Sequence, residues 1–271
     1  MFAINPFAAL SSFIPPGVMQ TYVLIMIFLV AAGTLFDIVH KGSAKYFFNN
    51  FRKAKGKPVG GGELVAIGVK TAVVDVLASG EFCNMKRRIA HLLTMYGFIL
   101  HIVATVVMVF NLSADSMWPH LWWIGGLMLL VGGYWFWFFI RVDVAAEGSS
   151  RWRVMHADLF VLSLLASVTF GLIWAWLQAR GSPWTNVFFG LYMLATTVLF
   201  AGVPWSKFAH MFFKPAAAFE KRMSEADGTN QNLPMLSRDD PEMQKRHSME
   251  LLQKAPMDMG LGIKREAPRH Y

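Results

Sequence analysis

Cysteine is almost missing from this chain, which carries a single one, Cys83, among 271 residues. One thiol cannot form an internal disulfide, and it cannot supply the clustered ligands of a zinc or iron–sulfur site. Charged residues are also few, at 15% of the chain. Any cofactor bound by this chain must therefore use ligands other than cysteine.

Several sequence motifs that announce a catalytic or nucleotide site are absent. The chain has no Walker loop, no G-x-G-x-x-G, no H-E-x-x-H and no G-x-S-x-G, so nothing points to nucleotide binding or hydrolysis. Lys and Arg are missing from residues 1–17, whereas a secretory signal peptide places them before its apolar run. We therefore expect the first apolar run to be retained as a membrane span, and we expect no nucleic-acid partner.

Long apolar runs, by contrast, dominate the chain, which is 55% hydrophobic and 14% aromatic. Each run is long enough to cross about 30 Å of hydrocarbon as a helix, and none shows the two-residue alternation of a membrane barrel. The predicted fold is an all-α membrane protein, a five-transmembrane-helix bundle over residues 1–213. The predicted spans are residues 18–39, 89–110, 121–140, 154–177 and 186–208.

The basic residues indicate how the bundle is oriented. Ten Lys or Arg lie between spans 1 and 2, none between spans 2 and 3, three between spans 3 and 4, and one between spans 4 and 5. The positive-inside rule then places the N-terminus outside and the C-terminus in the cytoplasm. Six tryptophans fall at the outer ends of the spans and predict an aromatic belt: Trp118, Trp122, Trp123, Trp174, Trp176 and Trp184.

Two segments lie outside the predicted spans. Residues 62–82 carry apolar positions at helical spacing, interrupted by Lys70 and Asp75, which predicts a cytoplasmic amphipathic helix on the membrane surface. An ordinary solvated connector is the alternative. Residues 214–271 form an extended polar tail, too poor in hydrophobic residues to fold alone, and we expect the tail to dock a partner.

Two histidines in the second span need a reason, because an ionisable side chain in hydrocarbon is costly. Ten residues at 1.5 Å rise place His101 about 15 Å deeper than His91, and ten steps of 100° leave the two side chains roughly 80° apart. Both can therefore face the bundle interior. For His101 alone, a hydrogen bond to a neighbouring helix is a slightly better explanation than a ligand role.

Two further histidines fall at the level of His91. His210 ends span 5 within SKFAHMFFKP, and His156 opens span 4. Imidazoles from two antiparallel helices can hold the iron of a haem between them, so His91 and His210 are candidate haem ligands. An interfacial His210 without such a role, like Lys207 beside it, is an equally good explanation on depth alone. His156 competes with His210 for that role, and it could instead donate to a quinone or cap its helix together with Asp158.

The stretches KRRIAHLLTMYGFILH and VPWSKFAHMFFKP resemble the di-haem cytochrome b membrane subunits related to the gamma subunit of respiratory nitrate reductase. Within that family the sequence looks most like the membrane subunit of the quinone-interacting membrane-bound oxidoreductase complex and the membrane anchor of adenylylsulfate reductase. The resemblance implies a bacterial inner-membrane, multi-pass location and haem b as cofactor. The family's second haem-ligating histidine of the last span is replaced here by Tyr192, which puts a second haem in doubt.

The function implied by the resemblance is membrane electron transfer. Quinone would exchange electrons with a cytoplasmic iron–sulfur or flavin oxidoreductase through haem b, in dissimilatory sulfur metabolism. Weaker candidates for the quinone site are Lys86, Arg87, Asp158, Tyr192 and Lys207. A haem-free membrane anchor that recruits the soluble partner is the alternative function. A small transporter fits less well, because no inverted repeat or broken span is visible.

Overall fold

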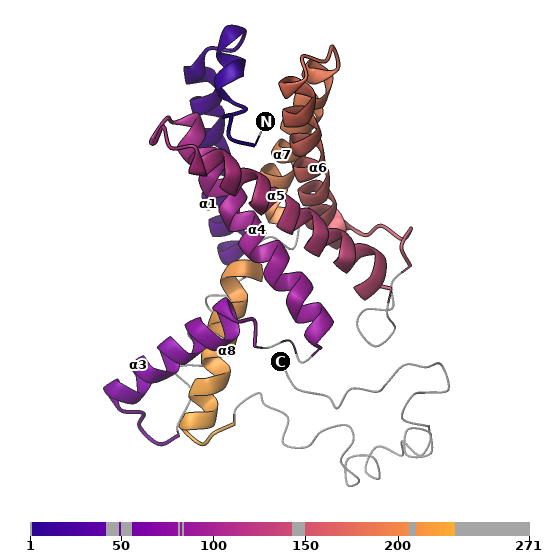
Figure 1. Cartoon of the computed structure of the whole chain (residues 1–271). Coiled ribbons are helices and arrows are strands. Elements are labelled where there is room, and N and C mark those ends of the chain that lie inside the picture. Colours follow the sequence, from indigo (N-terminus) through magenta and orange to yellow (C-terminus); the bar gives the residue numbers. More distant parts are fainter. Residues whose placement is uncertain are drawn as a thin grey trace. The chain divides into compact units, whose positions relative to one another are not determined.

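The computed structural model describes residues 2–41, 49, 56–80, 82, 84–142, 150–205 and 210–230. Within these ranges every regular element is helical and no strand occurs (Figure 1). The α-helices of the described residues are α1 (Pro16–Lys41), α3 (Gly61–Lys70), α4 (Met85–Val109), α5 (Met117–Trp135), α6 (Leu159–Ala179), α7 (Thr185–Ala201) and α8 (His210–Ala226). Short 3-10 helices are η1 (Ala8–Ser12), η4 (His156–Asp158) and η5 (Val203–Trp205), and π-helical segments are η2 (Thr71–Leu77) and η3 (Phe136–Ile140).

Four of these helices are long and apolar enough to cross a membrane. They are Pro16–His40, Met85–Val109, Met117–Ile140 and Leu159–Ala179. The prediction of an all-helical membrane protein is confirmed at this level. The fifth predicted span corresponds to α7, which is apolar but has only 17 residues.

The two largest differences from the predicted spans arise at local stop signals. Helix α6 begins at Leu159 rather than near residue 154, because the Asp158 carboxylate accepts a hydrogen bond from the backbone N–H of Met155 at 2.9 Å and fixes a 3-10 turn there. Helix α7 ends at Ala201 rather than near residue 208. Pro204 lacks the N–H that an α-helix needs, and the chain turns into η5 after Gly202.

The chain divides into two compact units, each described here by itself. The first comprises Met1–Gly42, Ile89–Trp137 and Arg153–His210, and so contains α1, most of α4, α5, α6 and α7. The second comprises Ser43–Arg88, Phe138–Trp152 and Met211–Tyr271, and its described helices are α3 with η2, the first turn of α4, and α8.

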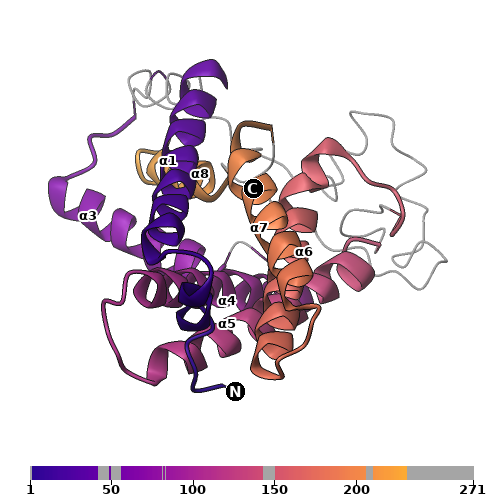
Figure 2. The ribbon, with the colours of Figure 1, turned by 90° about the horizontal axis from the view of Figure 1, so that it is seen from above.

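Side-chain hydrogen bonds join the helices of the first unit. Helices α6 and α7 lie side by side (Figure 2), and the hydroxyls of Ser167 and Thr196 are 2.7 Å apart between them. The Tyr134 hydroxyl lies 3.0 Å from that of Thr169, which joins α5 to α6. Such bonds stabilise helix association in lipid, where apolar burial contributes little.

Helices α4 and α5 approach so closely that their backbones touch at glycines. A Cβ added at Gly97 would lie 2.6 Å from the backbone nitrogen of Leu129, and one added at Gly125 would lie 2.7 Å from that of His101. At Gly132 the added atom would meet the carbonyl oxygen of Ala90 at 2.7 Å. Small residues allow this approach, and it places His101 directly against α5.

The second unit is built around α3, η2 and α8. Arg222 of α8 donates two hydrogen bonds to the carboxylate of Asp75 in η2, at 2.7 and 2.9 Å. The backbone N–H of Lys57 donates to the carbonyl oxygen of Asp227, just past α8. Residues 62–82 therefore do contain a helix, and α8 runs through residue 213, where we predicted the tail to begin.

Candidate intramembrane histidine site

His101 is the buried histidine of the first unit, with 5% of its surface exposed. Its Nδ1 lies 2.9 Å from the carbonyl oxygen of Trp122 on α5. The imidazole also stacks on the indole of Trp122, with 4.5 Å between ring centroids and 29° between the planes. The hydrogen bond to a neighbouring helix that we considered for His101 is therefore present.

The carbonyl contact fixes which nitrogen carries the proton. A carbonyl oxygen can only accept, so Nδ1 must donate, and in a neutral imidazole Nε2 then carries the lone pair. Nε2 is fully buried and has no hydrogen-bond partner among the described residues. Metal-ligating histidines commonly donate their other ring N–H to a backbone carbonyl in this way. His101 thus presents a buried, oriented Lewis base.

Trp122 on α5 contacts both His101 and Thr105, which lie one turn apart on α4. Its indole Nε1–H donates to the hydroxyl of Thr105 at 3.0 Å, and that hydroxyl donates to the backbone carbonyl of His101 at 2.7 Å. The three residues form a closed set of contacts between α4 and α5. The imidazole orientation is consequently fixed by packing and by two further hydrogen bonds.

Gly126 leaves the space that the imidazole occupies. A Cβ at this position would lie 3.2 Å from Nδ1 of His101 and 2.9 Å from Cδ2 of Leu172. Alanine would therefore force the ring or the leucine to shift. Gly126 is a determinant of the site that adds no chemistry of its own.

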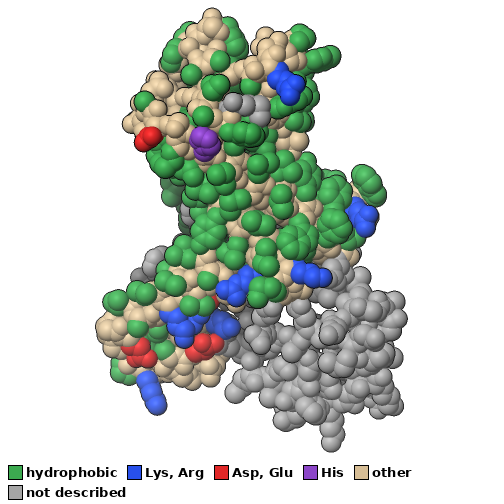
Figure 3. All heavy atoms as spheres, viewed as in Figure 1, with side chains coloured by type: hydrophobic (Ala, Val, Ile, Leu, Met, Phe, Trp, Pro, Cys, Tyr) green, Lys and Arg blue, Asp and Glu red, His purple; other side chains and the backbone are tan. Residues whose placement is uncertain are grey.

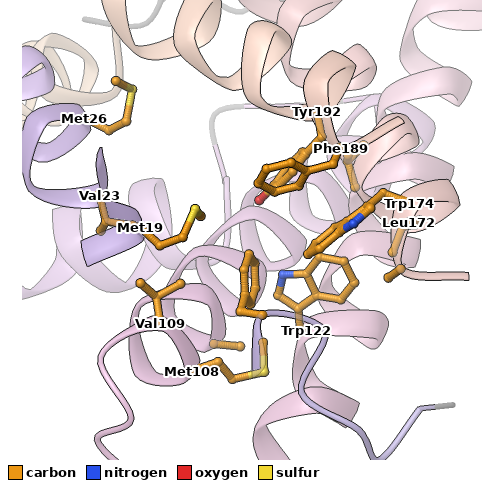
Figure 4. Close-up of a cluster of buried hydrophobic side chains, with 14 of the residues drawn as sticks. Met19, Val23, Met26, Met108, Val109, Trp122, Leu172, Trp174, Phe189 and Tyr192 are labelled. Atoms are coloured by element: carbon orange, nitrogen blue, oxygen red, sulfur yellow. The ribbon is translucent and has the colours of Figure 1, made fainter. Parts of the chain in front are cut away.

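An aromatic wall completes the site on α6 and α7. Figure 4 shows Trp122, Trp174, Phe189 and Tyr192 gathered at the centre of the first unit. Trp174 stacks on Tyr192 at 5.7 Å with 10° between the planes, and it packs against Phe189 at 5.1 Å. The indole Nε1 of Trp174 is buried and lacks a partner among the described residues. The wall therefore carries a second buried polar group, an N–H that could donate a hydrogen bond to a ligand.

Residues 5–7 cover one end of this aromatic wall. The Phe7 ring lies 5.3 Å from Trp174 and 6.1 Å from Trp122. Gln178 at the end of α6 donates to the carbonyl of Pro6 at 2.6 Å, and Asn5 donates to the carbonyl of Met108 near the end of α4. These contacts place residues 5–7 at the end of the bundle where α4 and α6 terminate.

The predicted haem pair His91 and His210 is not tested by these contacts. His91 is half-buried on α4, and it has interactions with other residues. His210 begins α8, but its side chain lies outside the described part of the structure. The pair remains a prediction.

His156 and Asp158 lie in the turn before α6 rather than at its start. His156 is exposed, whereas Asp158 is 6% exposed and accepts the hydrogen bond from Met155. Asp158 therefore has a structural role in the turn. No contact brings His156 to His91 in the described residues.

The remaining predicted quinone residues have different local surroundings. Lys86 is exposed in the first turn of α4, and the Arg87 guanidinium lies 5.2 Å above the ring of Phe82. Tyr192 belongs to the aromatic wall, and Lys207 lies outside the described residues. Lys86 and Arg87 fall in the second unit, Tyr192 in the first.

Apart from His101 and Tyr192, the residues that build the site were not predicted from the sequence. We predicted Trp122 and Trp174 as members of an aromatic belt at the outer membrane interface, but both are fully buried, whereas Trp176 and Trp184 are exposed. The available signal was the run of glycines following Trp122, at 125 and 126, because small residues mark a face that packs against another helix.

Metal coordination by side chains alone is not supported in the described ranges. No group of three or more His, Cys, Asp or Glu residues there could hold a metal ion. A metal at His101 would have to bring most of its own ligands, as the iron of a porphyrin does.

The fold and the site together define a helical membrane protein with an oriented imidazole buried in its bundle. The family model of citrate utilization protein B matches residues 2–230, and the chain belongs to that family. Citrate utilization protein B of Escherichia coli is 30% identical over 165 residues, which cover 56% of this chain and 42% of the relative. The chain therefore spans about two fifths of that relative's length. No solved structure matches.

Family membership corrects the function that the sequence led us to expect. The resemblance to the nitrate reductase gamma subunit, to the quinone-interacting oxidoreductase and to the adenylylsulfate reductase anchor was wrong, because the matching family is citrate utilization protein B. The assignment to quinone-linked electron transfer in dissimilatory sulfur metabolism falls with it, and so does the alternative of an anchor for that oxidoreductase. The depth of the histidines and the SKFAH segment indicate that imidazoles lie at membrane level, but these features do not identify a metabolic pathway.

Proposed function

We propose that this chain is a membrane-embedded component of citrate utilisation, in which the helical bundle holds a cofactor on His101. The name of the E. coli relative, citrate utilization protein B, supplies the physiological context. The buried lone pair of His101 Nε2, oriented by the Trp122 carbonyl, is the observation that carries the intramembrane role.

A path for citrate through the bundle is disfavoured by charge. Citrate is a tricarboxylate, and moving it through a low-dielectric bundle requires cationic partners. No Lys or Arg lies within residues 16–40, 89–110, 117–140, 159–179 or 185–201. We therefore assign to the bundle a role other than moving the substrate.

The proposed topology has five crossings in a bacterial inner membrane, with the N-terminus outside and the C-terminus cytoplasmic. Helix α7 serves as the fifth crossing: its 17 residues span about 25 Å, and local thinning of the bilayer can accommodate the shortfall. The contacts of residues 5–7 with the ends of α4 and α6 support this arrangement, because in it all three lie on the outer side.

Haem b is the cofactor that we propose for the bundle. The lone pair of His101 Nε2 would suit the iron of a haem, because the tautomer and the ring plane of His101 are already fixed. A bound haem would supply a one-electron redox centre inside the membrane. His101 would hold the iron, Trp122 and Thr105 would fix the ring, and the aromatic wall would exclude water. The predicted pair His91 and His210 is a second proposed position.

A soluble iron–sulfur or flavoprotein partner in the cytoplasm is also a proposal, with residues 214–271 as its docking segment. Its support is the polar composition of that segment.

Growth on citrate tests the physiological proposal. Deleting the gene should abolish growth on citrate and leave growth on another carbon source unchanged, and a plasmid copy should restore it. Uptake of labelled citrate by intact cells should keep its initial rate in the deletion strain. Loss of uptake would contradict the proposed role, because it would make the chain part of the transport path.

Cofactor content tests the site. Purified full-length protein should show haem by pyridine haemochrome assay, and His101→Ala should lower the haem bound per chain. His120→Ala is the matched control, because His120 is exposed and its Nδ1 bonds only within its own helix turn, to Ser116. Equal haem content in both variants would contradict the proposal that His101 is a ligand. Absence of haem from the unmodified protein would contradict the proposal that haem is the cofactor.

A further inference from the structure

Four apolar side chains along α3 and η2 are exposed in a single row. Val65, Val69, Val73 and Leu77 have 67, 58, 51 and 50% of their surface exposed. They recur every four residues and form what we call the valine stripe. A contiguous row of exposed apolar side chains indicates an interaction surface, whereas single exposed apolar residues need no explanation.

The change from α-helix to π-helix keeps the valine stripe straight. In an α-helix each four-residue step overshoots a full turn by about 40°, so three steps would carry Leu77 about 120° away from Val65. A π-helix has more residues in each turn, so its four-residue steps fall short and bring the side chains back. The switch at Thr71 therefore aligns all four side chains.

The opposite face of the same helix is already occupied by α8. Thr71 is 4% exposed, and Asp75 is bound by Arg222 of α8. A Cβ at Gly68 would touch the ring of Phe219, also on α8. Because α8 covers this face, the valine stripe points away from α8.

The end of η2 is tied to the start of a membrane span. The Arg88 side chain donates from Nε to the carbonyl oxygen of Ala78 at 2.8 Å, within the second unit. Arg88 is the last cation of α4 before the apolar run that begins at Ile89. A Lys or Arg at this point marks the headgroup level of a spanning helix, so η2 ends at that level.

Cations gather at the same junction. Arg87 and Lys214 lie over the ring of Phe82, at 5.2 and 4.9 Å from its centroid. Lys86 and Lys70 are exposed. Figure 3 shows hydrophobic side chains with Lys and Arg among them on the surface around α3. Apolar residues bordered by cations match a bilayer surface that carries anionic headgroups.

We propose that α3 and η2 lie in the interface of the membrane, with the valine stripe among the upper acyl chains and the cations at the junction on anionic phospholipid headgroups. The segment then fixes the chain between the first and second crossings to the bilayer. The inference does not depend on citrate or on haem.

The depth of a fluorescent probe on the stripe tests this proposal. The full-length protein, in a Cys83→Ser background, carries an environment-sensitive probe at Val69→Cys and is placed in nanodiscs with one third phosphatidylglycerol. Glu63→Cys is the control, because Glu63 is exposed on the same helix two residues from Val65, about 200° around the axis. We expect the Val69 probe to be quenched by lipids with a shallow nitroxide and the Glu63 probe by aqueous iodide.

Equal iodide quenching at both positions would overturn the proposal. A Val69 probe that is shielded in native membranes but exposed to iodide in nanodiscs would also overturn it, and would indicate a protein occupant. Replacing phosphatidylglycerol by phosphatidylcholine should weaken quenching of the Val69 probe by the nitroxide lipids. Lys86→Gln should weaken this quenching only in nanodiscs that contain phosphatidylglycerol, because each cation near an anionic surface contributes about fivefold to partitioning. No effect of lipid charge would remove the anionic headgroups from the proposal.

Discussion

At the scale of single residues, Nδ1 of His101 has a hydrogen-bond partner, whereas Nε2 has none within the described part of the chain. A buried polar atom without a partner costs roughly 1–3 kcal/mol, and the helix contacts around His101 hold that atom in place. A protein that keeps such an atom oriented towards its interior gains nothing from it in stability. This orientation is the basis on which we propose His101 as a cofactor ligand.

His101→Phe separates the two roles of this residue. Phenylalanine keeps the stacking on Trp122 and removes both the hydrogen bond and the unsatisfied nitrogen, so we expect the cofactor-free protein to change in unfolding free energy by less than about 1 kcal/mol. In cofactor-loaded protein the same substitution should lower the melting temperature, because ligand binding stabilises the folded state. Thermal unfolding of both preparations provides the measurement. A large loss in the cofactor-free protein would instead assign a structural role.

The depth of His101 could be predicted from the sequence, whereas its chemistry could not. Ten residues along one helix fix the level of His101 relative to His91 without any tertiary contact. The proton position depends on the carbonyl of Trp122, 21 residues away, and on the close crossing of α4 and α5. The local sequence of neither helix predicts that the turn carrying His101 contacts the turn carrying Trp122.

At the scale of helices, the close packing of α4 and α5 at glycines should contribute to stability. Gly97→Ala or Gly125→Ala should push the two backbones apart and cost about 1–3 kcal/mol, as overpacking does. Gly190→Ala is the matched control on α7, because a Cβ there meets nothing within 4 Å. Melting temperatures in detergent check this. Equal shifts in all three variants would mean that the added methyl groups act through the helix itself, not through the contact.

The ion pair of Asp75 and Arg222 joins η2 to α8. The hydrogen bonds to Asp75 raise the pKa of Arg222, so the guanidinium stays charged. Its contribution to stability is lost only as the pH rises through that raised pKa. Asp75→Asn should loosen α8 at neutral pH and speed limited proteolysis at the end of α8. Lys221→Gln is the control, since the contact of Lys221 with Glu225 is a 4.0 Å surface pair. Equal proteolysis of the two variants would contradict a role for the Asp75 pair.

Helix positions followed from hydropathy, and their ends did not. A run of apolar residues indicates where a helix lies, but Asp158 and Pro204 decide where α6 begins and where α7 ends. Both act through backbone hydrogen bonding, which a hydropathy window does not register. The helix over residues 62–82 was visible from its periodicity, whereas its attachment to α8 depends on a residue 147 positions later.

At the scale of the whole molecule, the number of crossings is the main testable quantity. In a Cys83→Ser background, a membrane-impermeant thiol reagent should label Ala114→Cys in intact cells and should not label Ser150→Cys or Glu225→Cys. All three positions are exposed, so protection reports the side of the membrane. Labelling of Glu225→Cys would show that α7 does not cross, and the chain would then have four spans.

The contact between Pro6 and Gln178 also sets an order of events during synthesis. Residues 172 positions apart must both exist before the bond forms, and at 5–20 residues per second the interval is about 10–35 s. Until then Phe7 has no Trp174 to pack on, and the interior around His101 stays open at that end. A prosthetic group would enter the nascent protein through this open end, and the completion of α6 would close the end behind it.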